Sequence, residues 1–105
     1  MALGDFEQMV LLAVLCVAQA GDEPYGVTVH TELERRTKRR VARGAVYMTL
    51  DRLEKKALLT SRLTDPTPER GGRAKRCYTV TPPALGALRA SRRALMRLWE
   101  GLERA

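Results

Sequence analysis

The feature that most constrains the fold is a stretch near the start of the chain whose apolar side chains would cover nearly the whole circumference of a helix. The spacing predicts a helix from Asp5, as its cap, to about Gln19. Its own small domain can cover only one side of such a helix, so a second surface must cover the other side. We therefore expect a partner chain to contact it, through Phe6, Met9 and Leu12.

This apolar stretch is similar to the core of an export signal, but the residues before it carry the wrong charge. Asp5 and Glu7 stand there without any Lys or Arg, whereas a signal peptide begins with a basic segment. The apolar run is also too short to span a bilayer. We therefore predict a cytoplasmic protein without a membrane partner.

The cysteines and the histidine indicate no redox or metal chemistry. Neither the number nor the spacing of Cys16 and Cys77 makes a disulfide framework or a metal motif, so both are predicted to be buried, unreactive thiols. His30 is the only histidine and is expected to be solvated or to cap a helix. No metal and no cofactor are predicted.

The sequence predicts two further helices. Proline is favoured at the first position of a helix, which predicts a second helix from Pro24 to about Arg36. After a basic connection over 37–41, a third helix is predicted from Arg43 to about Lys56. Three apolar residues at i, i+4 and i+7 would face its core, Val46, Leu50 and Leu53. The residues left on its outer side are Arg43, Tyr47, Met48, Thr49, Arg52 and Lys56.

Two β-favouring segments, 58–64 and 76–81, flank a segment with two prolines, adjacent glycines and three basic residues. That composition is typical of a flexible, positively charged hairpin tip. Thr81 would then cap a last helix that begins at Pro82. Its apolar residues form a heptad seam interrupted only by Arg92, and the seam is expected to pair two chains through Leu88, Leu95, Trp99 and Leu102.

These elements predict a mainly α fold with a small two-stranded β wing (α+β). Residues 1–81 would form a winged helix-turn-helix domain, and residues 82–105 would form a C-terminal dimerisation helix.

The basic residues are concentrated in one part of the chain. The net charge is +7, yet residues 35–76 hold fourteen Lys and Arg against four Asp and Glu, a balance of +10. The rest of the chain has a balance of −3. Such a segregated charge favours a polyanionic partner, with nucleic acid ahead of a membrane surface.

Duplex DNA fits this arrangement, because a helix can enter the major groove while basic elements on both sides hold the phosphates. The basic run alone would be an ordinary solvated face; a second basic element at 70–76 favours DNA contact. Gly44 would keep the start of the third helix slim enough to approach a phosphate. The predicted phosphate contacts are Arg39, Arg40, Arg43, Arg73 and Lys75. The predicted sequence-reading residues are Tyr47, Met48, Thr49 and Arg52.

Several motifs over about residues 3–90 resemble those of the PadR-like transcriptional regulators. They are Leu3–Leu12, Tyr25-Gly26, Gly44–Glu54, Gly72–Tyr78 and Thr81-Pro82. The resemblance implies a winged fold and a homodimer that binds an inverted-repeat operator. It also implies a role as a transcriptional repressor, associated with the nucleoid through its binding to DNA. The single short C-terminal helix is similar to the compact branch of that family.

The chain departs from the family pattern around the wing. Ala57 stands where the family usually has Gly, so we expect a shifted or mildly strained turn after the third helix. Cys77 stands where an aromatic residue is common. Neither departure removes a charge from the predicted DNA surface.

Several residues have two interpretations. Tyr47 either contacts a phosphate or base or packs at a helix–strand edge, and Arg52 either contacts DNA or pairs with Asp51 or Glu54. Trp99 either forms the core of a helix–helix interface or, with a second copy, frames a pocket for a flat aromatic ligand.

No catalytic residues are predicted, because the sequence lacks a nucleophile–base arrangement and a phosphate-cradling motif. The alternative to a DNA-binding regulator is a small helical protein–protein interaction module with a basic surface. Binding to duplex DNA that weakens steeply with salt would distinguish the two.

Overall fold

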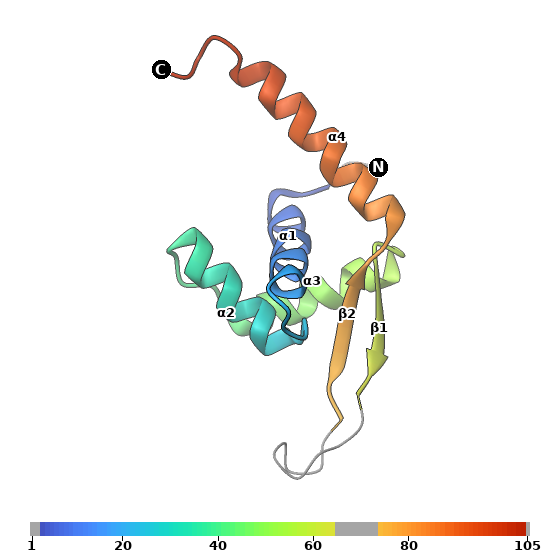
Figure 1. Cartoon of the computed structure of the whole chain (residues 1–105). Helices are drawn as coiled ribbons and strands as arrows, with labels where there is room; N and C mark the ends of the chain where they lie inside the picture. Colours follow the sequence, from blue (N-terminus) through green and yellow to red (C-terminus); the bar gives the residue numbers. More distant parts are fainter. Residues whose placement is uncertain (1–2, 65–73, 105) are drawn as a thin grey trace.

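The computed structural model describes residues 3–64 and 74–104 of the chain. The fold class predicted from the sequence is confirmed, because these residues form helices and one two-stranded antiparallel sheet. The elements follow one another as α1 (Asp5–Gln19), α2 (Gly26–Thr37), α3 (Arg43–Lys55), β1 (Leu59–Leu63), β2 (Arg76–Val80) and α4 (Pro82–Trp99) (Figure 1).

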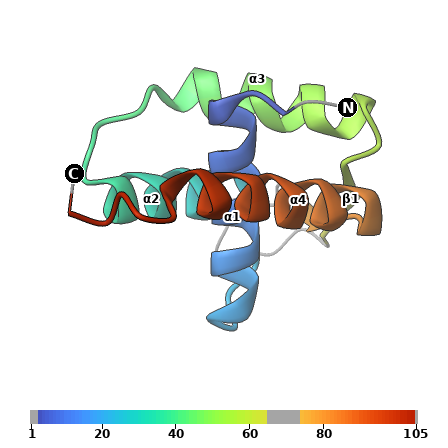
Figure 2. The same ribbon diagram turned by 90° about the horizontal axis from the view of Figure 1, so that it is seen from above.

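Helix α1 has the predicted bounds but a different cap. Gly4 is the N-cap, and Glu7 reaches back so that its Oε1 accepts a hydrogen bond from the Gly4 amide at 3.1 Å. This hydrogen bond satisfies the amide of the N-cap, so Asp5 is the first helical residue and not the cap. Seen from above, α1 crosses beneath α4 (Figure 2).

Helix α2 begins later than predicted, because the residues before it pair with the sheet. The Tyr78 amide donates to the carbonyl oxygen of Pro24 at 3.0 Å, and Tyr25 forms an antiparallel bridge with Cys77. Tyr25 is therefore the N-cap of α2. The prediction that Pro24 opens the helix is wrong; Pro24 lies beside β2 and is buried.

The two strands pair in register from Leu59 opposite Val80 to Leu63 opposite Arg76. The turn from α3 into β1 passes through Ala57, whose φ is +61°. A residue with a Cβ rarely adopts this left-handed conformation, so the expected strain at Ala57 is confirmed. The Leu58 amide donates to the Leu53 carbonyl at 2.9 Å, which closes the end of α3.

Helix α4 is attached to the rest of the fold through its first half, where the Ser91 hydroxyl also donates to Gln8 Oε1 on α1 at 2.7 Å. The Thr81 hydroxyl accepts a hydrogen bond from the Ala84 amide at 3.4 Å, as predicted for its cap. Ala84 and Leu88 are buried, but every residue from 92 to 99 is exposed, and the helix extends away from the other elements (Figure 1). The helix ends at Trp99.

The predicted seam is therefore shorter than expected. Gly101 follows the helix with a φ of +85°, and Leu102 lies beyond the helix end. The prediction that Leu102 continues a helical seam is wrong, because the backbone turns at the preceding glycine.

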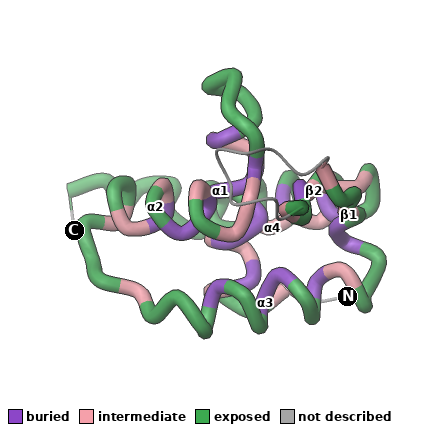
Figure 3. Tube along the Cα trace, turned by 90° about the horizontal axis from the view of Figure 1, so that it is seen from below, coloured by how far each residue is buried: buried purple, intermediate pink, exposed green. Residues whose placement is uncertain are grey.

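The core lies where α1, α2, α3 and β1 meet. Figure 3 shows that buried and exposed positions alternate along α3. No helix of the described residues is long and apolar enough to cross a membrane. The largest fully buried side chains are Val10, Leu11, Val14, Val29, Val46, Leu50, Leu53 and Leu59.

One ion pair joins the start of α1 to the end of α3. The Lys56 ammonium donates to Glu7 Oε2 at 2.7 Å, and Glu7 is only 7% exposed. The hydrogen bond from Lys56 holds the pKa of Glu7 below its ordinary value of 4.5, against the opposing effect of burial. Lys56, predicted to face outward, is thus engaged within the fold.

Candidate DNA-binding surface

Helix α3 presents one exposed face, which differs from the predicted one at a single position. Tyr47 and Met48 are 41% and 67% exposed, and Arg43 and Arg52 are exposed as well. Thr49, by contrast, is 3% exposed and lies on the buried side. The prediction that Thr49 faces outward is wrong, because the inward face includes position i+3 as well as i+4 and i+7 from Val46.

Arg52 makes no ion pair with either of its two candidate partners. Asp51 instead pairs with Lys55 at 3.2 Å, and Glu54 accepts a hydrogen bond from the Ser61 hydroxyl at 2.7 Å. Within the described part of the chain, the guanidinium of Arg52 is therefore available to an external acceptor.

The start of α3 is open to an approaching group. Its N-cap, Ala42, provides no side-chain cap, so amide groups of the first turn remain available. A Cβ built on Gly44 would have no neighbour within 4 Å among the described residues. The fold itself therefore does not require glycine at this exposed position, whereas close contact with an external phosphate would favour it.

The connection between α2 and α3 contributes exposed cations. Lys38, Arg39 and Arg40 are all exposed there. Arg35 and Arg36, just before them, both bind Glu32, at 2.7 and 2.6 Å. The free positive charge of this region thus lies in the connection rather than on α2.

His30 lies behind this connection and is buried, so the expectation that it is solvated is wrong. Its Nε2 lies 2.7 Å from the carbonyl oxygen of Val41, which requires the ring to donate. The residue holds a loop in place, which is close to the capping role that was the other expectation. The described residues contain no group of three or more His, Cys, Asp or Glu that could hold a metal.

Tyr47 packs against the first turn of α2. A Cβ on Gly26 would collide with Cε1 of Tyr47 and lie 2.9 Å from its Cδ1, so only glycine admits the ring. The packing interpretation of Tyr47 is therefore confirmed; the residue remains 41% exposed, and its contact with DNA stays a prediction. It borders a hollow of about 270 Å³ whose other lining residues are Tyr25, Gly26, Val27, Lys75, Arg76 and Tyr78.

This hollow brings the wing base next to α3. The Lys75 ammonium lies 5.4 Å from the centre of the Tyr25 ring, and Arg76 donates to the Ser61 hydroxyl at 2.8 Å. Burial raises the pKa of Tyr78 above its ordinary value, so its hydroxyl stays protonated. Arg76 belongs to the predicted basic element at 70–76 but is not among the predicted phosphate contacts, and it also lines this hollow. Arg73 lies outside the described residues.

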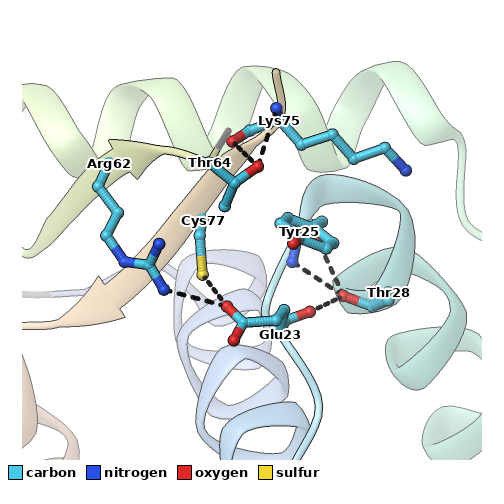
Figure 4. A network of polar contacts seen from close by, with 7 residues as sticks. All are labelled: Glu23, Tyr25, Thr28, Arg62, Thr64, Lys75 and Cys77. Carbon is cyan, nitrogen blue, oxygen red and sulfur yellow. Dashed lines mark hydrogen bonds and ion pairs between the residues drawn. The ribbon is translucent and has the colours of Figure 1, made fainter. Parts of the chain in front are cut away.

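A polar network behind the hollow attaches the wing to the α1–α2 turn (Figure 4). Glu23 Oε2 accepts from the Cys77 thiol at 3.0 Å and from Arg62 at 3.2 Å. Desolvation, strengthened by Glu23, raises the pKa of Cys77 to about 11. The thiol therefore remains protonated and unreactive, as predicted for Cys77, while Cys16 is half-buried rather than buried.

A second surface, the apolar groove, lies between α1 and α4. It has a volume of about 530 Å³ and is mostly apolar, with Arg89 and Arg92 at its margin. The groove brings together four of the seven predicted dimer residues, Leu12, Leu88, Leu95 and Trp99. Phe6 and Met9 pack against the core instead. Leu15, Leu85 and Met96 also line the groove. Leu15 lies on the predicted apolar first helix and Leu85 on the predicted heptad seam, whereas the sequence does not predict Met96, because a single-helix seam does not reveal which two helices face each other.

Comparison with known proteins agrees with this architecture. The sequence model of one protein family, the transcriptional regulator PadR-like family, matches residues 14–88 of this chain. Transcriptional regulator Rv3488 of Mycobacterium tuberculosis (strain ATCC 25618 / H37Rv) is 42% identical over 81 residues, which cover 75% of this chain and 69% of the relative.

Solved structures of low sequence identity share the fold. A PadR-like transcription factor from Bacteroides fragilis superposes with a TM-score of 0.73 at 18% identity, covering 92% of this chain and 85% of that one. A PadR-like transcriptional regulator from Bacillus cereus strain ATCC 14579 gives a TM-score of 0.67 at 20% identity, with 91% of each chain covered. From the family match and the similarity to Rv3488, this chain belongs to the PadR-like family of transcriptional regulators.

Proposed function

We propose that the chain is a sequence-specific regulator that binds double-stranded DNA with α3 in the major groove. One observation carries the proposal: α3 has one buried face and one exposed face, with exposed cations in the connection that leads into the helix and with Lys75 and Arg76 beside Tyr47 in the hollow. A helix of this kind fits the major groove, where base edges are distinguishable.

The exposed residues divide into two roles. We assign phosphate contacts to the cations at the margins, Arg39, Arg40, Arg43 and Lys75, and to Arg73 in the wing. Gly44 admits a phosphate close to the backbone. Base contacts fall to the exposed face of α3, that is to Tyr47, Met48 and Arg52. Thr49 receives no role, since its side chain is buried.

The test is the salt dependence of binding to a random duplex. Each engaged cation adds about 0.9 to the slope of log affinity against log salt. Replacing Arg39 and Arg40 by Gln should lower that slope by about 1.8. The matched control replaces Arg93 and Arg97 by Gln; both are exposed on α4 and do not line the apolar groove, so the change removes the same charge and should leave the slope unchanged. If the wild-type chain binds no duplex at low salt, the alternative of a protein–protein interaction module is favoured.

The active form is proposed to be a homodimer, with residues 1–81 binding DNA and residues 82–105 joining the copies. Leu95, Leu98 and Trp99 are 52%, 72% and 56% exposed, and contiguous apolar surface of this kind usually marks an interface. A second copy would cover α4 together with the outer side of α1. Sedimentation equilibrium at micromolar concentration should give the mass of two chains, and a monomer would contradict this assembly.

A two-fold dimer presents its two α3 helices to the same side of a duplex. Half-sites should then be inverted repeats about 10 base pairs apart. The regulatory outcome we propose is repression, through occupation of an operator that overlaps a promoter. A reporter gene carrying the selected operator should fall in expression when the chain is produced, whereas a rise would indicate activation.

We also propose that the groove accepts a flat aromatic ligand where two copies meet at Trp99. The support is a mostly apolar hollow of about 530 Å³ that contains the only tryptophan of the chain. Titration with acridine orange, a planar dye, should quench tryptophan fluorescence and raise the dye's anisotropy. The anisotropy rise should weaken in Trp99→Ala but persist in Leu63→Ala, on the exposed strand β1. Equal dye binding by both variants would place the dye elsewhere.

A further inference from the structure

The connection between α2 and α3 carries exposed cations on an unusual backbone. Lys38, the C-cap of α2, has a φ of +56°, in the left-handed region that residues with a Cβ rarely adopt. Arg39 and Arg40 follow and are exposed. The next helix begins from Ala42 without a side-chain cap. Contacts beyond the ordinary helix ends must therefore hold this segment in one conformation.

Those contacts converge on Val41. Its amide donates to Glu34 Oε2 at 2.8 Å, and its carbonyl oxygen accepts from His30 Nε2 at 2.7 Å. Both polar backbone groups of one residue are thus bound by side chains four positions apart on α2. The same Glu34 oxygen lies 3.6 Å from His30 Nε2, beyond hydrogen-bond distance, so the two side chains lie next to each other and are connected through Val41.

The clasp is partly buried. His30 is 9% exposed, and Val41 packs against the hydrophobic core. An unpaired carbonyl or imidazole at this depth would be unfavourable, so each group needs the other. Arg39 and Arg40 are therefore attached to a backbone segment that is fixed on one side by Lys38 and α2 and on the other by the clasp.

We propose that His30 and Glu34 are positioning residues for DNA binding: by holding Val41 they preset Arg39, Arg40 and Arg43 relative to α3. This inference rests on the proposed function. A preset loop loses less conformational entropy when its cations meet phosphates, so the clasp should raise affinity without touching DNA.

The role of Glu34 can be tested by whether its removal strengthens or weakens binding to DNA. Glu34 is a carboxylate beside a surface proposed to bind a polyanion. By charge alone, its removal should strengthen binding to DNA. If its main role is to hold Val41, its removal should weaken binding. Glu32 provides the matched control, because it lies on the same helix and binds only exposed arginines.

The experiment measures the affinity of the full chain for a random duplex at one salt concentration. Glu34→Ala should weaken binding roughly tenfold, which corresponds to about 1.4 kcal/mol. Glu34→Gln keeps an oxygen that can accept from the Val41 amide and should bind at least as tightly as wild type. Glu32→Ala should bind as tightly as wild type or more tightly. His30→Ala should weaken binding, with partial rescue in His30→Gln, whose amide can donate to the Val41 carbonyl.

Hydrogen exchange of the Val41 amide provides a readout independent of DNA. The amide should be protected in wild type and in Glu34→Gln, and should exchange faster in Glu34→Ala while core amides of α1 stay protected. If Glu34→Ala binds as tightly as Glu32→Ala, the positioning role is contradicted. If Val41 is unprotected in wild type, the clasp itself is contradicted. Failure of the wild-type chain to bind any duplex would overturn the proposed function, and the exchange result would still judge the clasp.

Discussion

Helices α3 and α4 both expose large side chains, but the two helices differ in how much of their opposite face is buried. On α3 the exposed residues stand opposite a row of fully buried ones, and the margins of the exposed face are basic. On α4 the buried residues end at Leu88 and the last hydrogen bond to α1 is made by Ser91. The exposed residues beyond them include Leu95, Leu98 and Trp99. A rigid polar face is stable in water until a partner arrives, whereas an exposed apolar face needs a lasting cover. This difference supports the proposal that α3 binds DNA transiently and that α4 joins two copies of the chain.

The largest effect should come from placing a charge on the exposed apolar part of α4. Leu95→Glu places a carboxylate in the apolar groove and should raise the dissociation constant of the dimer by about 100-fold or more, or about 2.8 kcal/mol. Sedimentation equilibrium measures it. Leu63→Glu, at an equally exposed leucine on β1, should leave the dimer intact. Dissociation of both variants alike would mean that α4 is not the seam.

The second largest effect should come from disturbing the packing of Tyr47 against α2. Gly26→Ala drives a methyl group into the Tyr47 ring and should lower the free energy of unfolding by about 1–3 kcal/mol. Gly44→Ala is the control, since its Cβ meets no described neighbour and alanine favours a helix. Its stability should be unchanged or slightly higher, while its affinity for duplex DNA should fall. Equal stability of the two variants in urea unfolding would show that the ring is not held by α2.

A smaller, pH-dependent effect should follow from Glu7, which joins α1 to the end of α3. Its pKa is lowered in the fold by the Lys56 hydrogen bond, so its contribution to stability exists above pH 4.5 and disappears as the pH falls through the lowered pKa. At pH 7, Glu7→Gln should cost roughly 1 kcal/mol, since Lys56 is partly solvated.

Urea unfolding of wild type and Glu7→Gln as a function of pH measures this contribution. The two curves should converge in acid. Asp5→Asn removes the same charge from the exposed side of the same helix end and should shift stability little at any pH. A difference between wild type and Glu7→Gln that stays constant down to low pH would contradict the ion pair as its origin.

The smallest effect should come from Ala57, which belongs to neither surface. Ala57→Gly relieves a positive φ and should raise the free energy of unfolding by up to about 1 kcal/mol. Thermal unfolding measures the gain, while the dimer constant and DNA affinity stay as in wild type. A loss of stability would show that the turn does not strain the alanine.

Sequence patterns predicted the elements well where one helix or one turn decides the outcome. The bounds of α1, the start of α3, the cap of α4 and the strain at Ala57 all follow from local spacing or from the family pattern. Local patterns were insufficient where the outcome depends on a distant segment. Pro24 pairs with β2, and His30 meets a loop that folds back onto α2.

The same reason explains the errors within the two surfaces. The spacing of Val46, Leu50 and Leu53 predicts a narrow inward stripe that leaves Thr49 outside, but α3 is covered over a wider arc. The apolar groove requires the crossing of α1 and α4, which no single-helix pattern contains (Figure 2). The close packing at Gly26 could have been predicted, because glycine allows another group to approach the backbone closely.

The most direct test of the central claim compares Arg52→Ala on two duplexes, an operator selected from a random pool and an unselected sequence. Arg52 is exposed on α3 and has no ion pair within the described residues. If α3 reads base edges, the variant should lose about 1–3 kcal/mol on the operator and almost nothing on the unselected duplex. An equal loss on both duplexes would mean that α3 only contacts the phosphates, and the division of roles between α3 and its margins would be wrong.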